Sequence, residues 1–442
     1  WLSNVVEIVA GNQHACARLQ NGTVRCWGRN SSRQLGDGTT TDRRTPVEIA
    51  GVTTAVQVVV GNQATCVRLM DGTVQCWGQT VPTGLSGVTQ VALGASHVCA
   101  LLSDRTVRCG GSNTYGQLGD GTTMARSSSV AVVGLSNVVE LSARGANSTC
   151  ARLMDGTVRC WGRNTEGYLG DGTRTDRPTP VAVTGLTDVA EVAVGPRHAC
   201  ARQSTGTVRC WGVNADGQLG NGDNDTQRSP SPMPGVSGVA EVAARAESTC
   251  LRLTDGAVRC VGSGFEDDRG VTLEGLASPV QIGVGNAFAC ARQTDGTVRC
   301  AGVNSSGQLG NGTTTSSPTT TVAVSDLTSA THLSVTNDHG CARRSDGTVR
   351  CWGRNTNGQL GDGTTTSRSA PVVVTGLSGA SAAGALYLHS CARMSDNTVR
   401  CWGQNSSGQL GDGTTTARTT PVAVGGLTGV AEVVGHSFYT CA

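Results

Sequence analysis

The stretch that decides the fold reads Cys16-Ala-Arg-Leu-Gln-Asn-Gly-Thr-Val-Arg-Cys26-Trp27-Gly28, and with small changes it occurs nine times in the chain. A three-residue loop at Gln20-Asn-Gly22 would place Cys16 opposite Cys26 on two antiparallel strands. Glycine suits the third loop position, because that residue takes a positive φ. Opposed residues of such strands lie about 4.5–5.5 Å apart at Cα, within the reach of a disulfide. Each copy therefore predicts a β-hairpin with a disulfide between its own strands.

The cysteines favour disulfides over a metal site. Structural zinc sites gather four ligands at short spacings, whereas this ten-residue spacing brings only two sulfurs together. A chain with 19 cysteines in this register is typical of an oxidising compartment. The predicted pairs are Cys16–Cys26, Cys66–Cys76, Cys99–Cys109, Cys150–Cys160, Cys200–Cys210, Cys250–Cys260, Cys290–Cys300, Cys341–Cys351 and Cys391–Cys401. Cys441 begins a tenth, incomplete copy without a partner in the sequence.

The segments around each hairpin complete a longer repeat of about 50 residues. An apolar strand precedes the hairpin, and in seven copies a loop resembling Asn355-Thr-Asn-Gly-Gln-Leu-Gly-Asp-Gly-Thr364 follows it. A proline then usually opens a fourth short strand. Two repeats are short and lack the loop, near 77–98 and 261–289. A lone four-stranded sheet cannot bury its faces, but packing against copies of itself can, so we expect an all-β propeller in which residues 1–442 form a single repeat array.

The repeat resembles a known family. Its pattern is clearest in residues 339–374, with Asp346-Gly347, Trp352-Gly353, Gly358-Gln-Leu-Gly361 and Pro371-Val372. This pattern is similar to the regulator of chromosome condensation (RCC1-like) repeat, and the resemblance covers essentially the whole chain. The family implies a propeller of four-stranded antiparallel blades, usually seven. Nine hairpins imply a larger ring, a second partial propeller or an open array. The added cysteine pair points to a secreted bacterial branch.

Members of that family act as a guanine-nucleotide exchange factor, as ubiquitin-ligase accessory domains, as a plant UV-B photoreceptor and as a secreted β-lactamase inhibitor. Fold alone selects none of these functions. The exchange factor uses a wedge-like insertion, and the photoreceptor uses a Gly-Trp-Arg-His-Thr motif. Neither feature is found in this sequence.

Composition narrows the class of function. The net charge is +2 and every basic residue is arginine, so Schiff-base chemistry is excluded and no field for nucleic acid is expected. No apolar run reaches the roughly 18 residues of a membrane span. No catalytic constellation stands apart from the repeat, so we expect no enzyme activity, no cofactor and no metal.

Several polar residues recur in the repeats, and each has a structural and a functional interpretation. The histidines could bind metal but fit packing or hydrogen bonding within a blade better. The Gly-Asp-Gly-Thr loops could bind calcium, yet one carboxylate per loop favours a turn. The arginines could bind anions or pair with a recurring Glu or Gln of the first strand. The histidines are His14, His97, His198, His339 and His389, and the tryptophans after the second cysteine are Trp27, Trp77, Trp161, Trp211, Trp352 and Trp402.

Binding should occur where the repeat is broken, at 79–87 and 262–275. Phe265, Glu266, Asp268 and Arg269 are the candidate binding residues. We hypothesise a non-catalytic extracellular module that binds a protein partner or self-assembles at the cell surface. The alternatives are a lectin-like propeller that binds a glycan and a secreted enzyme inhibitor of the same fold.

Overall fold

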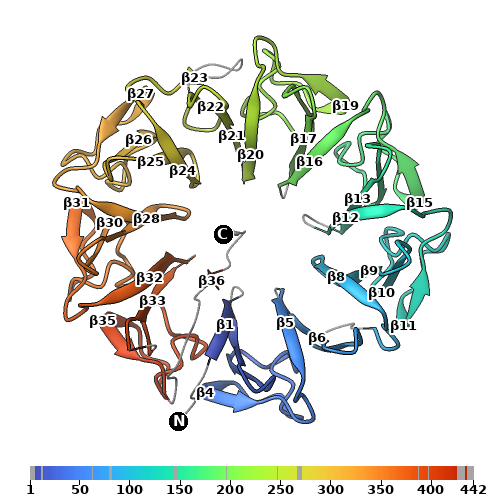
Figure 1. Ribbon diagram of the computed structural model, residues 1–442, viewed down its shortest axis with the longest axis horizontal. Coiled ribbons are helices and arrows are strands. Elements are labelled where there is room, and N and C mark those ends of the chain that lie inside the picture. Colours follow the sequence, from blue (N-terminus) through green and yellow to red (C-terminus); the bar gives the residue numbers. More distant parts are fainter. Residues whose placement is uncertain are drawn as a thin grey trace. The chain divides into compact units, whose positions relative to one another are not determined.

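The computed structural model describes residues 5–10, 13–61, 63–78, 82–143, 147–195, 197–245, 247–265, 271–386, 388–396, 398–425 and 434–435. These residues form an all-β fold of nine antiparallel propeller blades, numbered 1 to 9 in chain order (Figure 1). No helix that could span a membrane occurs among them. Nine blades exceed the seven that are usual for the family that the repeat resembles. The count agrees with the nine hairpins of the sequence.

The first five blades have the following strands. Blade 1 contains β1 (Val5–Ala10), β2 (His14–Leu19), β3 (Val24–Gly28) and β4 (Arg43–Glu48); blade 2 contains β5 (Ala55–Val60), β6 (Ala64–Leu69) and β7 (Val74–Gly78). Blade 3 contains β8 (Val88–Leu93), β9 (His97–Leu102), β10 (Val107–Gly111) and β11 (Arg126–Ala131). Blade 4 contains β12 (Val138–Ser142), β13 (Ser148–Leu153), β14 (Val158–Gly162) and β15 (Arg177–Ala182). Blade 5 contains β16 (Val189–Val194), β17 (His198–Gln203), β18 (Val208–Gly212) and β19 (Gln227–Pro232).

The remaining blades follow the same order. Blade 6 contains β20 (Val239–Arg245), β21 (Ser248–Leu253), β22 (Val258–Gly262) and the two-residue β23 (Val271–Thr272). Blade 7 contains β24 (Pro279–Val284), β25 (Phe288–Gln293), β26 (Val298–Gly302) and β27 (Ser317–Ala323). Blade 8 contains β28 (Ala330–Val335), β29 (His339–Arg344), β30 (Val349–Gly353) and β31 (Arg368–Val373). Blade 9 contains β32 (Ala380–Ala385), β33 (His389–Met394), β34 (Val399–Gly403) and β35 (Arg418–Ala423), and β36 (Val434–Gly435) pairs in parallel with β1.

The hairpin between the second and third strands forms as the sequence predicts. In blade 1 the Leu19 amide donates to the Thr23 carbonyl at 2.8 Å, and Gly22 takes a φ of 78°. Cys16 lies directly opposite Cys26, and all nine predicted disulfides are present among the described residues. Their Cα–Cα distances of 4.0–4.1 Å are those of a close pair that exchanges no backbone hydrogen bonds with each other.

The hydrophobic core lies between neighbouring blades rather than inside each one. One cluster joins Val349 and Leu360 of blade 8 to Ala383 and Trp402 of blade 9, all fully or nearly fully buried. Similar clusters join blades 9 and 1, 3 and 4, 4 and 5, 5 and 6, and 7 and 8, so these sheets bury faces against their neighbours, as the propeller interpretation requires.

The chain divides into two compact units, residues 1–62 with 272–442, and residues 63–271. In the first unit blade 9 packs against blade 1, where the Trp27 indole donates to the Gln409 carbonyl at 3.2 Å. The second unit contains blades 3, 4 and 5 complete, together with β6, β7 and the first strands of blade 6.

Candidate functional site

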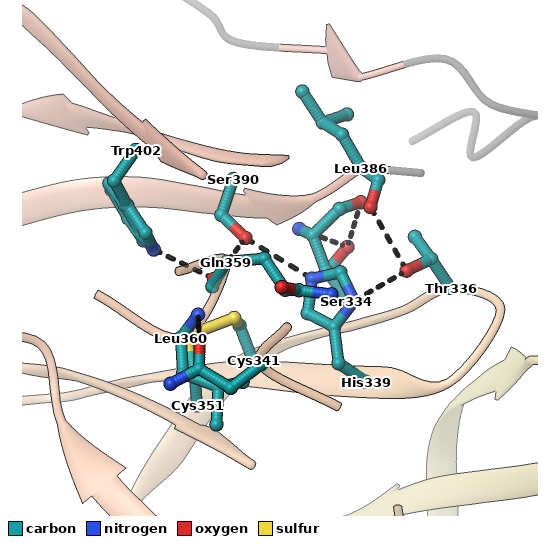
Figure 2. The surroundings of a disulfide bond; sticks show 12 residues. Ser334, Thr336, His339, Cys341, Cys351, Gln359, Leu360, Leu386, Ser390 and Trp402 are labelled. Atoms are coloured by element: carbon teal, nitrogen blue, oxygen red, sulfur yellow. Dashed lines mark hydrogen bonds between the residues drawn. A yellow bond between two sulfur atoms is a disulfide. The ribbon is translucent and has the colours of Figure 1, made fainter. Parts of the chain in front are cut away.

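A buried polar network links blade 8 to blade 9 beside the Cys341–Cys351 disulfide (Figure 2). His339 Nε2 lies 3.2 Å from Ser390 Oγ, and Ser390 donates to the Gln359 carbonyl at 2.9 Å. The Trp402 indole donates to the same carbonyl at 2.8 Å. Because the Ser390 hydroxyl gives its proton to Gln359, His339 must donate from Nε2 to Ser390.

The second unit repeats this arrangement. His97 Nε2 lies 2.7 Å from Thr149 Oγ1 of the next blade, and His198 Nε2 lies 2.8 Å from Thr249 Oγ1. Thr249 donates to the Gln218 carbonyl at 2.8 Å. The expected hydrogen bonding within a blade is found for His339, whose Nδ1 lies 3.1 Å from Thr336 Oγ1. The Nε2 partners of all three histidines, however, belong to the following repeat, about 50 residues away.

Burial determines the charge of the histidines. Burial lowers the pKa of His339 to about 3, with a further contribution from the neighbouring His389, and lowers the pKa of His97 and His198 to about 4. These side chains are neutral at pH 7 and hold adjacent blades together. Among the described residues no group of three His, Cys, Asp or Glu side chains is arranged to hold a metal ion.

The Gly-Asp-Gly-Thr loops are fully occupied by hydrogen bonds of their own. Asp362 accepts bonds from the Thr364 amide at 3.0 Å, the Asn355 amide group at 3.1 Å and Arg368 Nε at 2.7 Å. Partial burial by itself raises the pKa of Asp362, but the bonds from Thr364 and Arg368 outweigh it and lower that pKa. Asn355 is buried and accepts from the Leu360 amide at 2.9 Å. The loop is a turn whose carboxylate already has a cationic partner.

The arginines two residues after the first cysteine pair with the first strand, as the structural interpretation predicts. Arg18 binds Glu7 at 2.8 Å, and Arg202 binds Glu191 at 2.9 Å. The arginines just before the second cysteine do not reach that strand: Arg299 binds Thr321 of the fourth strand instead. For this second set, pairing with the first strand is a wrong prediction, because the third strand lies next to the fourth.

The linker to blade 3 covers one end of the first break in the repeat, in blade 2. Leu85 pairs with Val74 as an isolated bridge, and Thr83 pairs in parallel with β11 of blade 3. Pro82 is buried where a Cβ on Gly110 would collide with its ring. Gly110 replaces the usual tryptophan, so the proline of the shortened blade occupies part of the space that an indole fills elsewhere. Residues 79–81 of the predicted contact segment lie outside the described residues.

The second break, in blade 6, contains the candidate binding residues. Phe265 is only 7% exposed, and its amide donates to the Gly262 carbonyl at 3.0 Å. Glu266, Asp268 and Arg269 lie outside the described residues. Further along, Glu274 pairs in parallel with β27 of blade 7, as Thr83 does with β11.

One feature of blade 2 was missed by the sequence reasoning. Among the described residues β7 is the outermost strand of its sheet, without a fourth strand after it. Only Val74 of β7 is fully buried, Gln75 is exposed and Trp77 is half-buried, whereas the tryptophans Trp27, Trp161, Trp211, Trp352 and Trp402 are at most 1% exposed. The signal in the sequence was available, because the short repeat lacks both the loop and the proline-led strand.

Comparison with known proteins gives a consistent result. A family model described as the regulator of chromosome condensation (RCC1) repeat matches residues 5–34, 88–117, 138–167, 189–218, 280–308, 330–359 and 383–409. A second model with the same description matches residues 21–68, 155–202, 205–251 and 346–390, so the two together cover most of the chain.

Solved structures of similar fold include Prp20p from Saccharomyces cerevisiae, 17% identical, with 96% of this chain and 86% of that chain covered and a TM-score of 0.52. Yeast RCC1 (Prp20) bound to Kap60 is 18% identical over 93% and 83% of the two chains, with a TM-score of 0.53. Human WBSCR16 is 18% identical over 90% and 92%, with a TM-score of 0.51. At these identities the likeness concerns the fold.

Proposed function

Because the chain belongs to the regulator of chromosome condensation (RCC1) repeat family, we propose that it is a non-catalytic, extracellular protein-binding module. The observation that carries the proposal is the use of the recurring polar side chains. The histidines, the loop aspartates and the first set of arginines bond to neighbouring strands and blades, as His339, Asp362 and Arg18 do. The two shortened repeats, in blades 2 and 6, are where the sequence departs most from the common pattern.

Structures of similar fold support a protein partner. One reports the binding properties of Prp20p to Gsp1p and histones, and another contains yeast RCC1 bound to Kap60. A rigid propeller with an irregular segment on one blade suits such binding, because a preorganised surface loses little conformational entropy on association. A sugar-binding role is less well supported, since five of the repeat tryptophans are at most 1% exposed and cannot stack on a ring.

An extracellular location follows from the disulfides in this proposal. Nine disulfides are present in the described part of the chain, and each closes a hairpin. Disulfides persist in secreted and cell-surface proteins and are rare in proteins of reducing compartments. Bridges that each close a loop of eleven residues stabilise the hairpins locally, whatever the order in which the blades assemble. We propose that the protein belongs to a secreted bacterial branch of the family, to which the added cysteine pair in each repeat points.

The proposed contact surface is the irregular segment of blade 6. Phe265, being 7% exposed, would anchor the segment, and Glu266, Asp268 and Arg269 would supply charged groups for the partner. Residues 82–87 of blade 2 form the second candidate surface, and Thr83, Gly84, Ser86 and Gly87 are exposed there.

The test uses the purified protein as bait to capture partners from culture medium and from a cell-surface extract. The charge variant Glu266→Ala/Asp268→Ala/Arg269→Ala and the anchor variant Phe265→Ala are compared with Arg174→Ala, an exposed arginine in the regular loop of blade 4. We expect the charge variant to lose a protein that both wild type and Arg174→Ala retain. Capture of the same proteins by all variants would contradict the assignment of the surface. A glycan array and sedimentation velocity identify sugar binding or self-assembly, either of which would replace the proposal.

A further inference from the structure

Blade 2 differs from the other blades at the outer edge of its sheet. In blade 1 the second cysteine of the hairpin, Cys26, pairs with Val47 of the fourth strand, and in blade 8 Cys351 pairs with Val372. The corresponding residue of blade 2 is Cys76. Among the described residues β7 has no fourth strand, and the isolated bridge between Val74 and Leu85 is its one pairing on that side.

The backbone groups of Cys76 face this edge. Cys66 and Cys76 lie 4.1 Å apart at Cα, the spacing of an antiparallel pair that exchanges no hydrogen bonds. The amide and carbonyl of Cys76 therefore point away from β6. Gly78 lies two residues further along β7, opposite Ala64, so its amide and carbonyl point the same way. Val74 lies two residues before Cys76, so its amide also points away from β6, and it donates to the Leu85 carbonyl at 2.9 Å.

Side-chain burial gives independent evidence of an uncovered edge. In β30 of blade 8, Val349, Cys351, Trp352 and Gly353 are all buried. The equivalent positions of β7 are half-buried from Cys76 onward, and Gln75 is exposed. An unpaired edge with a half-buried tryptophan is a template for another strand.

We propose that the outer edge of β7 binds an extended segment of a partner protein, which adds to blade 2 as an antiparallel fourth strand. The inference rests on the proposed protein-binding function and names one docking site for it. Strand addition of this kind takes its affinity from main-chain hydrogen bonds and its specificity from alternate side chains.

The other blades indicate the chemistry of the segment. The residue opposite the second cysteine of the hairpin is valine in six of the described fourth strands and serine in one: Val47, Val130, Val181, Ser231, Val322, Val372 and Val422. Five of these valines are partly buried against the core clusters. The partner segment should therefore place a β-branched apolar residue opposite Cys76.

The charge of the residue before the second cysteine further limits which segments can bind to blade 2. In blade 1 the arginine before the second cysteine binds Glu48 of the fourth strand at 3.1 Å. Blade 2 has Gln75 at this position, so a carboxylate in the partner would find no cationic side chain there. We expect a segment that contains valine or isoleucine and is uncharged at the position opposite Gln75.

Hydrogen exchange with the free protein tests the open edge. The amides of Cys76 and Gly78 should exchange at least about tenfold faster than those of Cys351 and Gly353, which face a fourth strand in the same molecule. Equal protection at both sites would overturn the proposal, since the edge would already be covered.

A peptide with the sequence of residues 367–373, Ser-Arg-Ser-Ala-Pro-Val-Val, tests strand addition directly, and it ends before the position that Leu85 already occupies opposite Val74. Fluorescence anisotropy of the labelled peptide should give saturable binding, and the bound peptide should slow exchange at Cys76 and Gly78. The matched control is the same peptide N-methylated at the residue equivalent to Val372, which removes one ladder donor and should weaken binding at least about tenfold.

No saturation up to about 1 mM peptide, equal binding of the N-methylated peptide, or protection elsewhere than β7 would overturn the proposal. Protection of Cys76 that depends on protein concentration would overturn it in favour of pairing between two copies. If captured partners persist while the peptide fails to bind, only strand addition is wrong. If no partner is captured by any form of the protein, the proposed function itself fails.

Discussion

Acid should weaken this propeller through its buried histidines, and His97 provides the sharpest test. Its ring is buried, Nε2 bonds to Thr149 at 2.7 Å, and Nδ1 has no hydrogen-bond partner. A proton added at Nδ1 would therefore place a charge in a dry site without an acceptor. Burial accordingly lowers the pKa of His97 to about 4.

The sign and size of the effect follow from linkage. The pKa in the unfolded chain is about 6.5, above that of the folded protein, so the unfolded state binds the proton first as the pH falls. The contribution of neutral His97 is complete above pH 6.5 and is lost as the pH drops through 6.5 toward 4. Between pH 7 and pH 5 the loss amounts to about 2 kcal/mol for this one residue.

The assay is urea unfolding at pH 7 and pH 5, with disulfides intact, followed by tryptophan fluorescence. The matched variant is His97→Gln, which retains a side-chain N–H donor but does not titrate. It should be less stable than wild type at pH 7, because its fit is poorer. Its stability should nevertheless fall less between the two pH values, by about 2 kcal/mol.

Equal losses for wild type and His97→Gln would refute the reasoning, since they would show that His97 does not titrate differently in the folded and unfolded states. The aspartates cannot mimic the effect in this window. The pKa of Asp362, for example, lies below its ordinary value, so its contribution is lost only as the pH falls below about 4.

Three further predictions concern stability. The double variant Cys341→Ala/Cys351→Ala should lower the free energy of unfolding by about 3 kcal/mol, because the bridge closes an eleven-residue loop. Calorimetry at neutral pH measures this loss, and an unchanged unfolding transition would count against the disulfide-linked hairpin as a stabilising unit. Asn355→Ala should cost about 2–3 kcal/mol in urea titration, because it orphans several buried groups, and a loss below 0.5 kcal/mol would contradict that role. Trp402→Phe should cost about 1–3 kcal/mol, since the indole bonds to a buried carbonyl, while Trp77→Phe on the open edge should cost less; the reverse order would be inconsistent with the burial of the two rings.

The sequence predicts contacts within a repeat well and contacts between repeats poorly. The Cys341–Cys351 pair follows from a loop of known length, because register in a hairpin is set by its turn. The bond from His339 to Ser390 depends instead on how one sheet twists against the next, which no local pattern encodes. Nothing in the sequence around Ser390 indicates that its partner is His339.

The same limit applies to the candidate site. The missing loop of the short repeat was recognised, but its effect on the exposed edge of β7 depends on which strand would have covered it. A signal was present in the following repeats, where Gly110 and Ala301 stand in place of tryptophan. Gly110 and Ala301 each belong to a blade that follows a shortened repeat. The shortened repeats lack the loop glutamine whose carbonyl would accept a hydrogen bond from an indole at that position.

The dependence of each tryptophan on the preceding loop has a consequence for how such a chain can be lengthened or shortened. Trp402 bonds to the loop of blade 8, and a Cβ on Gly361 of that loop would lie 2.8 Å from the same indole. A module cut at blade boundaries would separate the two. The interchangeable module is offset by half a repeat, running from the third strand and loop of one blade to the hairpin of the next. Recombination, natural or engineered, should succeed when its crossover points respect that offset.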